Sequence, residues 1–425
     1  MKFKDINLHP LILKAIKDSK YEDATPIQAK SIPEILKGSD ILASAHTGTG
    51  KTAAFLLPAL HKLANQNTKS KNAKVLILVP TRELALQVYK QALKYSRYLR
   101  NIKTVCIYGG IPYYKQRKEL NKKHDILIAT PGRLIDYLDN DKISLNEIEL
   151  LILDEADRML DMGFIQPVKK IARSSSSKRQ TLLFSATLKN SILNLTKDLL
   201  KNPITIKTND KDINLKNIKH YLYKADDLNH KLKLLNHFLD DEKLTKAIIF
   251  TSTKSFSETL CKKLKETGHK IEFLHGDIPQ RKRERIIAYF SQNKTKHLIA
   301  TDVAARGIDV KNISHVINFD IPMCAEDYIH RIGRTGRANE NGTAYSFSLN
   351  KDTKKINEIE NLLSKKIDSA TVEGLEPKER PKQRKEFGKK DFKKGFKKKF
   401  FKKSFKKSNG SKNKNFNNKS QKTFR

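Results

Sequence analysis

The chain has 425 residues, 38% of them hydrophobic, and Lys+Arg outnumber Asp+Glu by 85 to 46. This length suffices for two domains of ordinary size, and the net charge of +39 indicates a polyanionic partner, nucleic acid first and an anionic membrane surface second. Three scattered cysteines argue against a disulfide framework or a zinc site. The charged N-terminus is unlike a secretory signal, and no apolar run approaches the ~18 residues of a membrane span. We therefore expect a cytoplasmic protein.

Short apolar segments alternate with longer helical stretches from about residue 40 to 207. Most of these segments are near-continuously apolar and rich in Val, Ile and Leu, which is typical of strands buried on both faces of a parallel sheet. The alternation predicts βαβ units with right-handed crossovers. The predicted strands are DILASA (40–45), KVLILVP (74–80), TVCIYG (104–109), DILIATP (125–131), LLILDEA (150–156), TLLFSAT (181–187) and ITIK (204–207).

The same alternation resumes after a polar segment, 208–219, that we interpret as a linker. It predicts a second α/β domain over 220–366, of a size similar to the first domain over 1–207. Two successive sheets of this kind indicate a duplicated architecture with a cleft between the copies. The predicted strands are HYLYKA (220–225), AIIFTST (247–253), IEFLHG (271–276), HLIATD (297–302), HVINFD (315–320) and TAYSFSL (343–349).

The composition changes sharply towards the end of the chain. Residues 378–425 contain 21 Lys+Arg against 3 Asp+Glu, and eight Phe but no Val, Ile, Leu or Met. Without aliphatic residues such a segment cannot build a core, so we expect a disordered basic tail over 367–425. Lysines with interspersed phenylalanines suit sequence-tolerant RNA binding. A basic amphipathic helix on an anionic membrane and a segment that only aids solubility are the alternatives.

The segment AHTGTGKT (45–52) directly follows a predicted strand and precedes a helical stretch. Glycines let the backbone turn tightly and point N–H groups at phosphate oxygens, the Lys51 ammonium can reach the β and γ phosphates, and the Thr52 hydroxyl can hold Mg²⁺. Ala45 stands where the strict form of this loop has glycine. The predicted nucleotide-binding residues of the loop are Ala45, His46, Thr47, Gly48, Thr49, Gly50, Lys51 and Thr52.

A second chemical signal is LLILDEAD (150–157), in which carboxylates follow four apolar strand residues. In open α/β sheets this end of a strand faces the ligand crevice. Asp154 fits the role of organising Mg²⁺ through its water shell, and Glu155 fits the role of orienting and deprotonating an attacking water. Alone, the segment would be read as the solvated acidic start of a helix. Beside a phosphate loop in the same sheet it predicts nucleoside triphosphate hydrolysis.

The letters Asp-Glu-Ala-Asp name a family, and over about residues 1–350 the chain resembles the DEAD-box ATP-dependent RNA helicases, most closely the bacterial RhlE-like subgroup. The resemblance implies two tandem RecA-like domains with parallel sheets flanked by helices. The motifs that carry it are TPIQ (25–28), AHTGTGKT (45–52), PTRELA (80–85), Gly109-Gly110, TPGR (130–133), DEAD (154–157), SAT (185–187), FTSTK (250–254), HGDIPQRKR (275–283), TDVAARGID (301–309) and HRIGRTGR (330–337).

The resemblance implies ATP as the nucleotide, because Gln28 would hydrogen-bond the adenine edge while Tyr21 stacks on the ring. It also implies that Ser185 and Thr187 link the nucleotide site to strand separation, through the DEAD segment and His330. The remaining implied ATP contacts are Gly307 and Asp309, with Asp309 at the ribose, and the arginine fingers Arg334 and Arg337. Two positions depart from the family pattern: His46 replaces the usual Gln, and Lys20 stands where Gly is common.

RNA contacts implied by the resemblance are Arg82, Gly109, Gly110, Thr130, Arg133, Gln280, Arg283 and Thr301. Backbone N–H groups at glycines and helix N-termini bind phosphates without reading sequence, and the 2′-hydroxyl marks RNA. A DNA-directed helicase on the same ATPase core and a non-catalytic RNA-binding scaffold are the alternatives. Beyond RNA, we expect a monomer with ribosome-assembly or RNA-decay factors as candidate partners, and no membrane.

Overall fold

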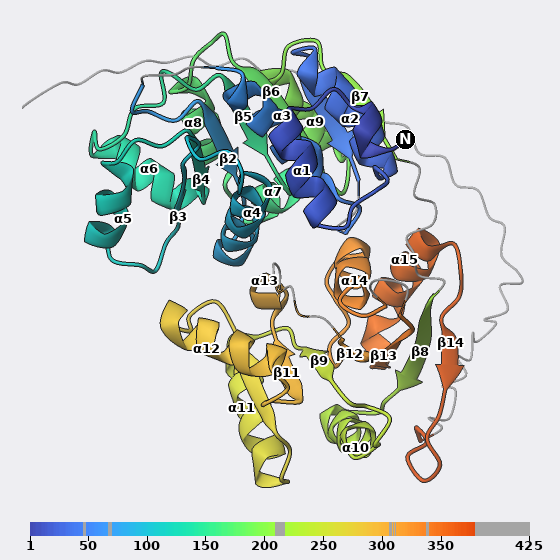
Figure 1. Cartoon of the computed structure of the whole chain (residues 1–425). Helices are drawn as coiled ribbons and strands as arrows, with labels where there is room; N and C mark the ends of the chain where they lie inside the picture. The colour runs from blue at the N-terminus through green and yellow to red at the C-terminus, as the bar shows by residue number, and fades with distance from the viewer. Residues whose placement is uncertain are drawn as a thin grey trace, which may run out of the picture. The chain divides into compact units, whose positions relative to one another are not determined.

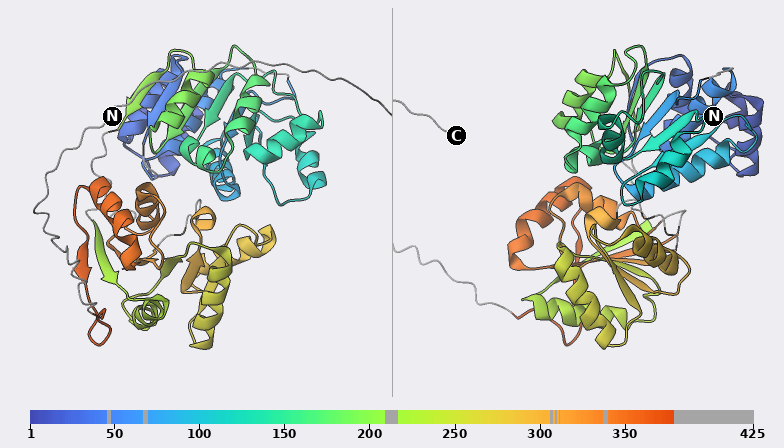
Figure 2. Two further views of the ribbon diagram at one scale, coloured as in Figure 1. Left: turned by 180° about the vertical axis from the view of Figure 1, so that it is seen from behind. Right: turned by 90° about the vertical axis from the view of Figure 1, so that its left-hand side faces the viewer.

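The computed structural model describes residues 1–45, 48–66, 70–208, 217–305, 308, 310, 312–336 and 340–378. Residues Met1–Lys378 form one compact unit that contains two seven-stranded sheets with helices on both faces (Figures 1 and 2). Every strand pairing in these sheets is parallel. The predicted fold class, two tandem RecA-like α/β domains, is confirmed. No helix of the described ranges is both long and apolar enough to span a bilayer.

The first sheet has the strand order β3-β4-β2-β5-β6-β1-β7. Its strands are β1 (Ile41–Ser44), β2 (Val75–Leu78), β3 (Thr104–Ile107), β4 (Ile126–Ala129), β5 (Leu150–Leu153), β6 (Gln180–Ser185) and β7 (Ile204–Lys207). The accompanying helices are the 3₁₀ turn η1 (Phe3–Asp5), α1 (Pro10–Asp18), α2 (Pro26–Leu36), α3 (Lys51–Ala64), α4 (Arg82–Tyr95), α5 (Tyr113–Leu120), α6 (Pro131–Asp139), α7 (Ala156–Asp161), α8 (Ile165–Arg173) and α9 (Asn190–Leu199).

The second sheet repeats this order as β10-β11-β9-β12-β13-β8-β14. Its strands are β8 (Ile218–Lys224), β9 (Ala247–Phe250), β10 (Ile271–Leu274), β11 (His297–Ala300), β12 (His315–Asn318), β13 (Gly342–Ser348) and β14 (Asp368–Ala370). The helices are α10 (Leu228–Leu239), α11 (Lys254–Glu266), α12 (Gln280–Ser291), α13 (Asp302–Ala305), α14 (Ala325–Ile332), α15 (Thr353–Leu363) and the 3₁₀ turn η4 (Asn350–Asp352).

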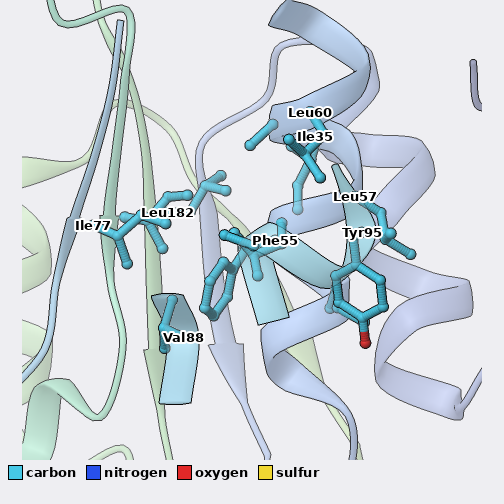
Figure 3. Packing of buried hydrophobic residues seen from close by; sticks show 14 of the residues in the cluster. Ile35, Phe55, Leu57, Leu60, Ile77, Val88, Tyr95 and Leu182 are labelled. Carbon is cyan, nitrogen blue, oxygen red and sulfur yellow. The ribbon is translucent and has the colours of Figure 1, made fainter. Parts of the chain in front are cut away.

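Two hydrophobic cores enclose the first sheet, because successive strand residues point to opposite faces. Helices α1 to α4 bury their apolar residues on one face, and α6 to α9 on the other. Figure 3 shows Phe55 of α3 and Val88 of α4 near Ile77 and Leu182 of the sheet, and Ile35 of α2 beside Leu60 of α3. Phe55 is fully buried there, with its ring centroid 5.4 Å from that of Phe184. Truncating such a residue to alanine typically destabilises a domain by about 3–5 kcal/mol.

All thirteen predicted strand segments contain a strand, but the second sheet also has β14, which we did not predict. This strand pairs with Tyr221–Tyr223 of β8, so the sheet extends past residue 366, where we expected the second domain to end. His230 Nε2 then lies 2.9 Å from the Leu375 carbonyl oxygen, which fixes the chain further along. Most of the predicted linker, residues 209–216, and the predicted tail from 379 onwards lie outside the described residues.

Candidate ATP site and RNA interface

Apart from Tyr21 and Gln28, which precede β1, the predicted site residues of the first domain follow the carboxyl ends of strands, and the sheet order divides them into two groups. Loops after β1, β5 and β6, three adjacent strands, carry the phosphate loop, the DEAD segment and the SAT segment. Loops after β2, β3 and β4, the other adjacent set, carry the predicted RNA contacts. The two groups meet where β2 pairs with β5, and there the Asp154 N–H donates to the Leu78 carbonyl over 3.0 Å.

The phosphate loop connects β1 to α3, as the sequence predicts. Gly48 and Gly50 adopt φ values of 90° and 92°, which lie in the left-handed region that favours glycine. Lys51 is buried at the first position of α3, and its Nζ donates to the Ala45 carbonyl over 2.9 Å. The ammonium is therefore held inside the predicted phosphate loop. Thr52, next on α3, is half-buried.

Gln28 lies against the phosphate loop through both ends of its amide. Its Oε1 accepts from the Thr25 N–H over 2.9 Å, and its Nε2 donates to the Gly50 carbonyl over 2.9 Å. A side chain at position 50 would meet that amide, since an added Cβ would lie 2.3 Å from Nε2. Tyr21 is 44% exposed, with the Lys94 ammonium 4.9 Å from its ring centroid.

The two carboxylates predicted for catalysis are both buried at the end of β5. Burial raises the pKa of Asp154 to about 6, although the Lys51 ammonium opposes the shift. Burial also acts to raise the pKa of Glu155, but Arg158 and then Lys51 outweigh it, so the net shift is downward. Glu155 has φ 52°, a left-handed conformation that is strained for a side chain of this kind. A strained, charged carboxylate at the end of a sheet strand is typical of a catalytic base.

The third carboxylate of the DEAD segment connects it to the SAT segment. Asp157 Oδ2 accepts from the Ala186 N–H over 3.2 Å and from the Thr187 hydroxyl over 3.4 Å. Within the SAT segment, the Ser185 hydroxyl donates to the Thr187 carbonyl over 2.6 Å. Side chains therefore connect the end of β5 to the end of β6, at the edge of the sheet where the predicted nucleotide-binding residues lie.

The predicted RNA contacts of the first domain form a second continuous group. Arg82 begins α4 and packs against the Gly109-Gly110 turn that follows β3. Arg133 is buried on α6, and its Nη1 donates to the Ile111 carbonyl over 2.9 Å. Thr130 is likewise buried, at the start of α6.

In the second domain the predicted RNA contacts also follow neighbouring strands. Gln280 and Arg283 lie on α12 after β10, and Thr301 follows β11. Arg283 Nη2 donates to the Ala304 carbonyl over 2.7 Å. Gln280 accepts from Arg82 over 3.3 Å, and Arg283 pairs with Glu83, a residue that the sequence analysis did not single out.

His330 lies in the last turn of α14 and Arg334 two residues after the helix ends, between β12 and β13. Both are buried or nearly so, and Arg334 Nη1 donates to the Ile308 carbonyl over 3.1 Å. Burial lowers the pKa of His330, with Asp327 acting in the opposite direction and Arg158 in the same one. His46, Thr47, Gly307, Asp309 and Arg337 lie outside the described residues, so their predicted roles stay predictions.

Beside the DEAD carboxylates, sequence reasoning missed Arg158. It is 2% exposed on α7, its Nη1 donates to Glu155 Oε2 over 2.9 Å, and its Nη2 has no partner among the described residues. The signal was present in the sequence, because an arginine three residues after a glutamate lies on the same side of a helix. Within the described ranges, no three His, Cys, Asp or Glu side chains gather as a metal site.

Comparison with known proteins decides the family. A model described as DEAD/DEAH box helicase matches residues 25–195, and one described as helicase conserved C-terminal domain matches 230–339. The chain is 40% identical over 381 residues to the ATP-dependent RNA helicase SrmB of Haemophilus influenzae, covering 89% of this chain and 86% of that protein. The chain belongs to the DEAD-box ATP-dependent RNA helicases. The helicase is also 40% identical to the ATP-dependent RNA helicase RhlB of Shewanella sp. (strain MR-4), over 86% of this chain and 84% of that one.

Solved structures agree with this placement of the helicase. S. cerevisiae Dbp5 bound to RNA and ADP BeF₃ superposes with a TM-score of 0.78 at 30% identity, covering 87% of this chain and 95% of that one. Mss116p bound to ssRNA and AMP-PNP superposes with a TM-score of 0.77 at 31% identity, over 88% of this chain and 80% of that one. The helicase thus shares its fold across both sheets with proteins captured on RNA and an ATP analogue.

Proposed function

We propose that this helicase hydrolyses ATP at the end of β5 and couples hydrolysis to local unwinding of RNA duplexes and remodelling of RNA–protein complexes. The observation that carries this proposal is the side-chain connection from Asp157 to Thr187, one strand away from the phosphate loop. Glu155 orients and deprotonates the attacking water, because its pKa is held low by Arg158 and Lys51. Ser185 and Thr187 pass the state of the nucleotide on to the RNA side, with His330 as their partner in the second domain.

The nucleotide is ATP with Mg²⁺. The Thr52 hydroxyl would hold Mg²⁺, and the Asp154 carboxylate would organise the ion through its water shell. Mg²⁺ ordinarily keeps several waters and is bound through one or two carboxylates plus substrate phosphates. The raised pKa of Asp154 fits a carboxylate whose burial a cation would offset. When bound, Mg²⁺ would neutralise charge that develops on the phosphates. Tyr21 stacks on the adenine, and Gln28 reads its edge from its place against the Gly50 carbonyl.

Arg334 and Arg337 act on the γ-phosphate from the second domain, and Gly307 and Asp309 complete the pocket, with Asp309 at the ribose. Positive charge at the transferring phosphoryl group is worth about 10³–10⁵ in rate where such arginines have been removed from NTPases. Replacing Arg334 by alanine in the full chain would slow hydrolysis far more than it weakens ATP binding. If the hydrolysis rate and the ATP affinity fell by equal factors, Arg334 would instead contribute to binding of ATP in the ground state.

RNA binds along Arg82, Gly109, Gly110, Thr130 and Arg133 in the first domain. The second domain adds Gln280, Arg283 and Thr301. ATP favours the state in which both domains engage the nucleotide, since a ligand shifts an equilibrium by its differential affinity for the two states. RNA bound by both domains is bent, and the bend opens a short duplex. Release of phosphate after hydrolysis then frees the RNA.

The experiment is ATP hydrolysis with matched RNA and DNA oligonucleotides, for the wild type and for Glu155→Gln. We expect RNA, but not DNA, to stimulate ATP hydrolysis by the wild type strongly. The E155Q variant should hydrolyse no ATP, and its complex with RNA should last longer with ATP than without it. Equal stimulation by DNA would make this a DNA-directed helicase. Absence of ATP turnover in the wild type would make it an RNA-binding scaffold.

The proposal extends to the subgroup, location and partners of the helicase. The protein acts as a cytoplasmic monomer of RhlE-like type, and the basic tail tethers RNA without reading sequence. Ribosome-assembly or RNA-decay factors are its expected partners. Crosslinking in cells followed by sequencing of the bound RNA tests the pathway, because ribosomal precursors and messenger fragments give different maps.

A further inference from the structure

Helix α5 carries two adjacent tyrosines at its N-terminal end, directly after the Gly109-Gly110 turn. Tyr113 is 47% exposed and Tyr114 is 69% exposed, which makes Tyr114 the most exposed tyrosine among the described residues. A single exposed aromatic residue is ordinary on a protein surface. What sets this pair apart is how its surroundings are built.

The first tyrosine is fixed in place. Its hydroxyl donates to Asp136 Oδ2 over 2.8 Å, and the Arg133 guanidinium lies 4.1 Å from its ring centroid. The Tyr137 ring meets it edge-on at 5.6 Å, and the Tyr137 hydroxyl donates to the Tyr113 carbonyl over 3.2 Å. Helices α5 and α6 are thereby joined at the predicted phosphate-binding arginine.

The start of α5 is also anchored to the strand that precedes the glycine turn. Gln116 is buried, and its Nε2 donates to the Tyr108 carbonyl at the end of β3 over 2.8 Å. Arg133 holds the intervening loop through the Ile111 carbonyl. Because both ends of this short connection are hydrogen-bonded, the backbone that carries Tyr114 is preorganised relative to Gly109-Gly110. Preorganised groups lose less conformational freedom on binding.

The second tyrosine is left open. Among the described residues, Tyr114 has no hydrogen-bond, ion-pair or ring partner. Lys115, Arg117 and Lys118 of the same helix are exposed beside it. An aromatic ring next to cations is the combination that binds single-stranded nucleic acid, since every base offers a π-face and every linkage a phosphate.

We propose that Tyr114 stacks on an unpaired RNA base adjacent to the phosphates held at Gly109-Gly110 and Arg133. The inference rests on the proposed RNA-binding role of those residues and adds a contact to a base where they contact only the backbone. Tyr113 serves as a positioning residue, because its ring is occupied by Arg133 and its hydroxyl by Asp136. The contact is tolerant of sequence and specific for single strands, since a paired base has no free face to offer.

The chain contains no tryptophan, so Tyr114→Trp creates a single fluorescent reporter at the proposed contact. We expect its emission to fall at least about twofold when a short single-stranded RNA saturates the protein. Leu362→Trp is the matched control, because Leu362 is 45% exposed on α15, away from every predicted RNA contact in the sequence. Its emission should stay constant. An oligonucleotide of equal charge with abasic sites should still bind but leave the emission of the Y114W variant unchanged.

Affinity gives the second readout. Tyr114→Ala should weaken single-stranded RNA binding by about fivefold or more, in line with one lost stacked base, while Tyr114→Phe retains wild-type affinity because the ring is kept. Tyr289→Ala, at an exposed tyrosine of α12, is the control. Binding by Y114A within twofold of wild type, or unquenched emission of Y114W on bound RNA, overturns the proposal. If either result is obtained while RNA still stimulates the ATPase of the wild type, only the stacking proposal fails. If RNA does not stimulate the ATPase of the wild type, the proposed function itself fails.

Discussion

Arg158 Nη1 donates to Glu155 Oε2 over 2.9 Å, and both side chains are buried in the first domain. A buried carboxylate without a partner is costly, because the low-dielectric interior does not replace its hydration. The arginine therefore supports the charged form of the residue proposed as the catalytic base. It does so from one helical turn away, so the pair is set by α7 itself and does not depend on a distant segment.

Replacing Arg158 by methionine should destabilise the protein by about 3–5 kcal/mol, the usual cost of removing one partner of a buried pair. For a domain of this size that corresponds to a fall of roughly 6–20 °C in the unfolding midpoint. In a Glu155→Gln background the same substitution should cost much less, since no buried charge is left behind. Thermal unfolding of the four proteins of this cycle measures the difference. Equal costs in both backgrounds would show that Arg158 acts through packing alone.

Replacing Lys51 by alanine should abolish ATP turnover and leave RNA binding in place. The ammonium is the one side-chain cation that the described part of the phosphate loop presents, and it is held 2.9 Å from the Ala45 carbonyl. Lys62→Ala is the matched control, because Lys62 lies on the same helix but pairs with Glu149 at the surface. Steady-state hydrolysis at saturating RNA compares them. Turnover of K51A within about threefold of wild type would rule out this loop as the active site.

Replacing Gly110 by alanine should weaken RNA binding through a steric clash. Gly110 has φ 85°, and an added Cβ would lie 2.2 Å from Arg82 Nη1, so the arginine must move. Gly163→Ala is a matched control, since φ 78° imposes similar backbone strain but nothing lies within 4 Å of the new Cβ. Both variants should lose about 1–2 kcal/mol of stability from the left-handed backbone. Only G110A should lose RNA affinity, and equal affinities would exclude Arg82 from the interface.

Acid should destabilise the second domain through His297. Burial, and then the neighbouring His269, lower the pKa of His297 to about 4, whereas an unfolded histidine titrates near 6.5. As the pH falls from 6.5 towards 4, the unfolded chain takes up a proton that the folded chain does not, so stability falls. The loss reaches about 2 kcal/mol at pH 5, at 1.36 kcal/mol per pH unit. Unfolding midpoints at pH 7.5 and pH 5 should therefore differ less for His297→Leu than for the wild type.

Removing residues 377–425 should lower the apparent RNA affinity and flatten its dependence on salt, while ATP turnover at saturating RNA is nearly unchanged. If the tail neutralises about six phosphates, the log–log slope on single strands should decrease by roughly 4, at ~0.7 per phosphate. Titrations from low to moderate salt, with and without the tail, provide the comparison. An unchanged slope contradicts RNA tethering, and liposome binding that disappears with the tail would instead favour the membrane alternative.

The strands were predictable because each central one is a short apolar run buried on both faces. Leu150–Leu153 is the clearest example, with all four residues buried. Strand β14 escaped prediction because Asp368–Ala370 has no such run. It exists through backbone pairing with β8, a partner more than 140 residues away in the sequence. Pairing of this kind leaves little trace in local composition, so the end of the second domain was placed too early.

The sequence motifs predicted which loops, at the ends of which strands, carry the site residues. They did not predict backbone conformation, burial or contacts between separate helices. Lys20 stands where the family commonly has glycine, and its φ of 58° shows that this position retains the left-handed backbone that glycine favours. Such a conformation cannot be read from a lysine. The spacing of Glu155 and Arg158 was visible in the sequence, but the burial of the pair was not. The anchoring of Tyr113 by Arg133 depends on two helices that only the fold brings together.

In the first sheet the predicted ATP-site residues follow β5, β6 and β1, and the predicted RNA contacts follow β3, β4 and β2; the two groups adjoin where β2 pairs with β5. Variation in the loops after β3 and β4 can therefore change which RNA is preferred without disturbing the hydrolytic residues. A small molecule directed at the α5–α6 surface would leave the nucleotide pocket free, so raising the ATP concentration would not displace it. An inhibitor that binds the loops after β3 and β4 could therefore distinguish one helicase from others that share the same ATP pocket.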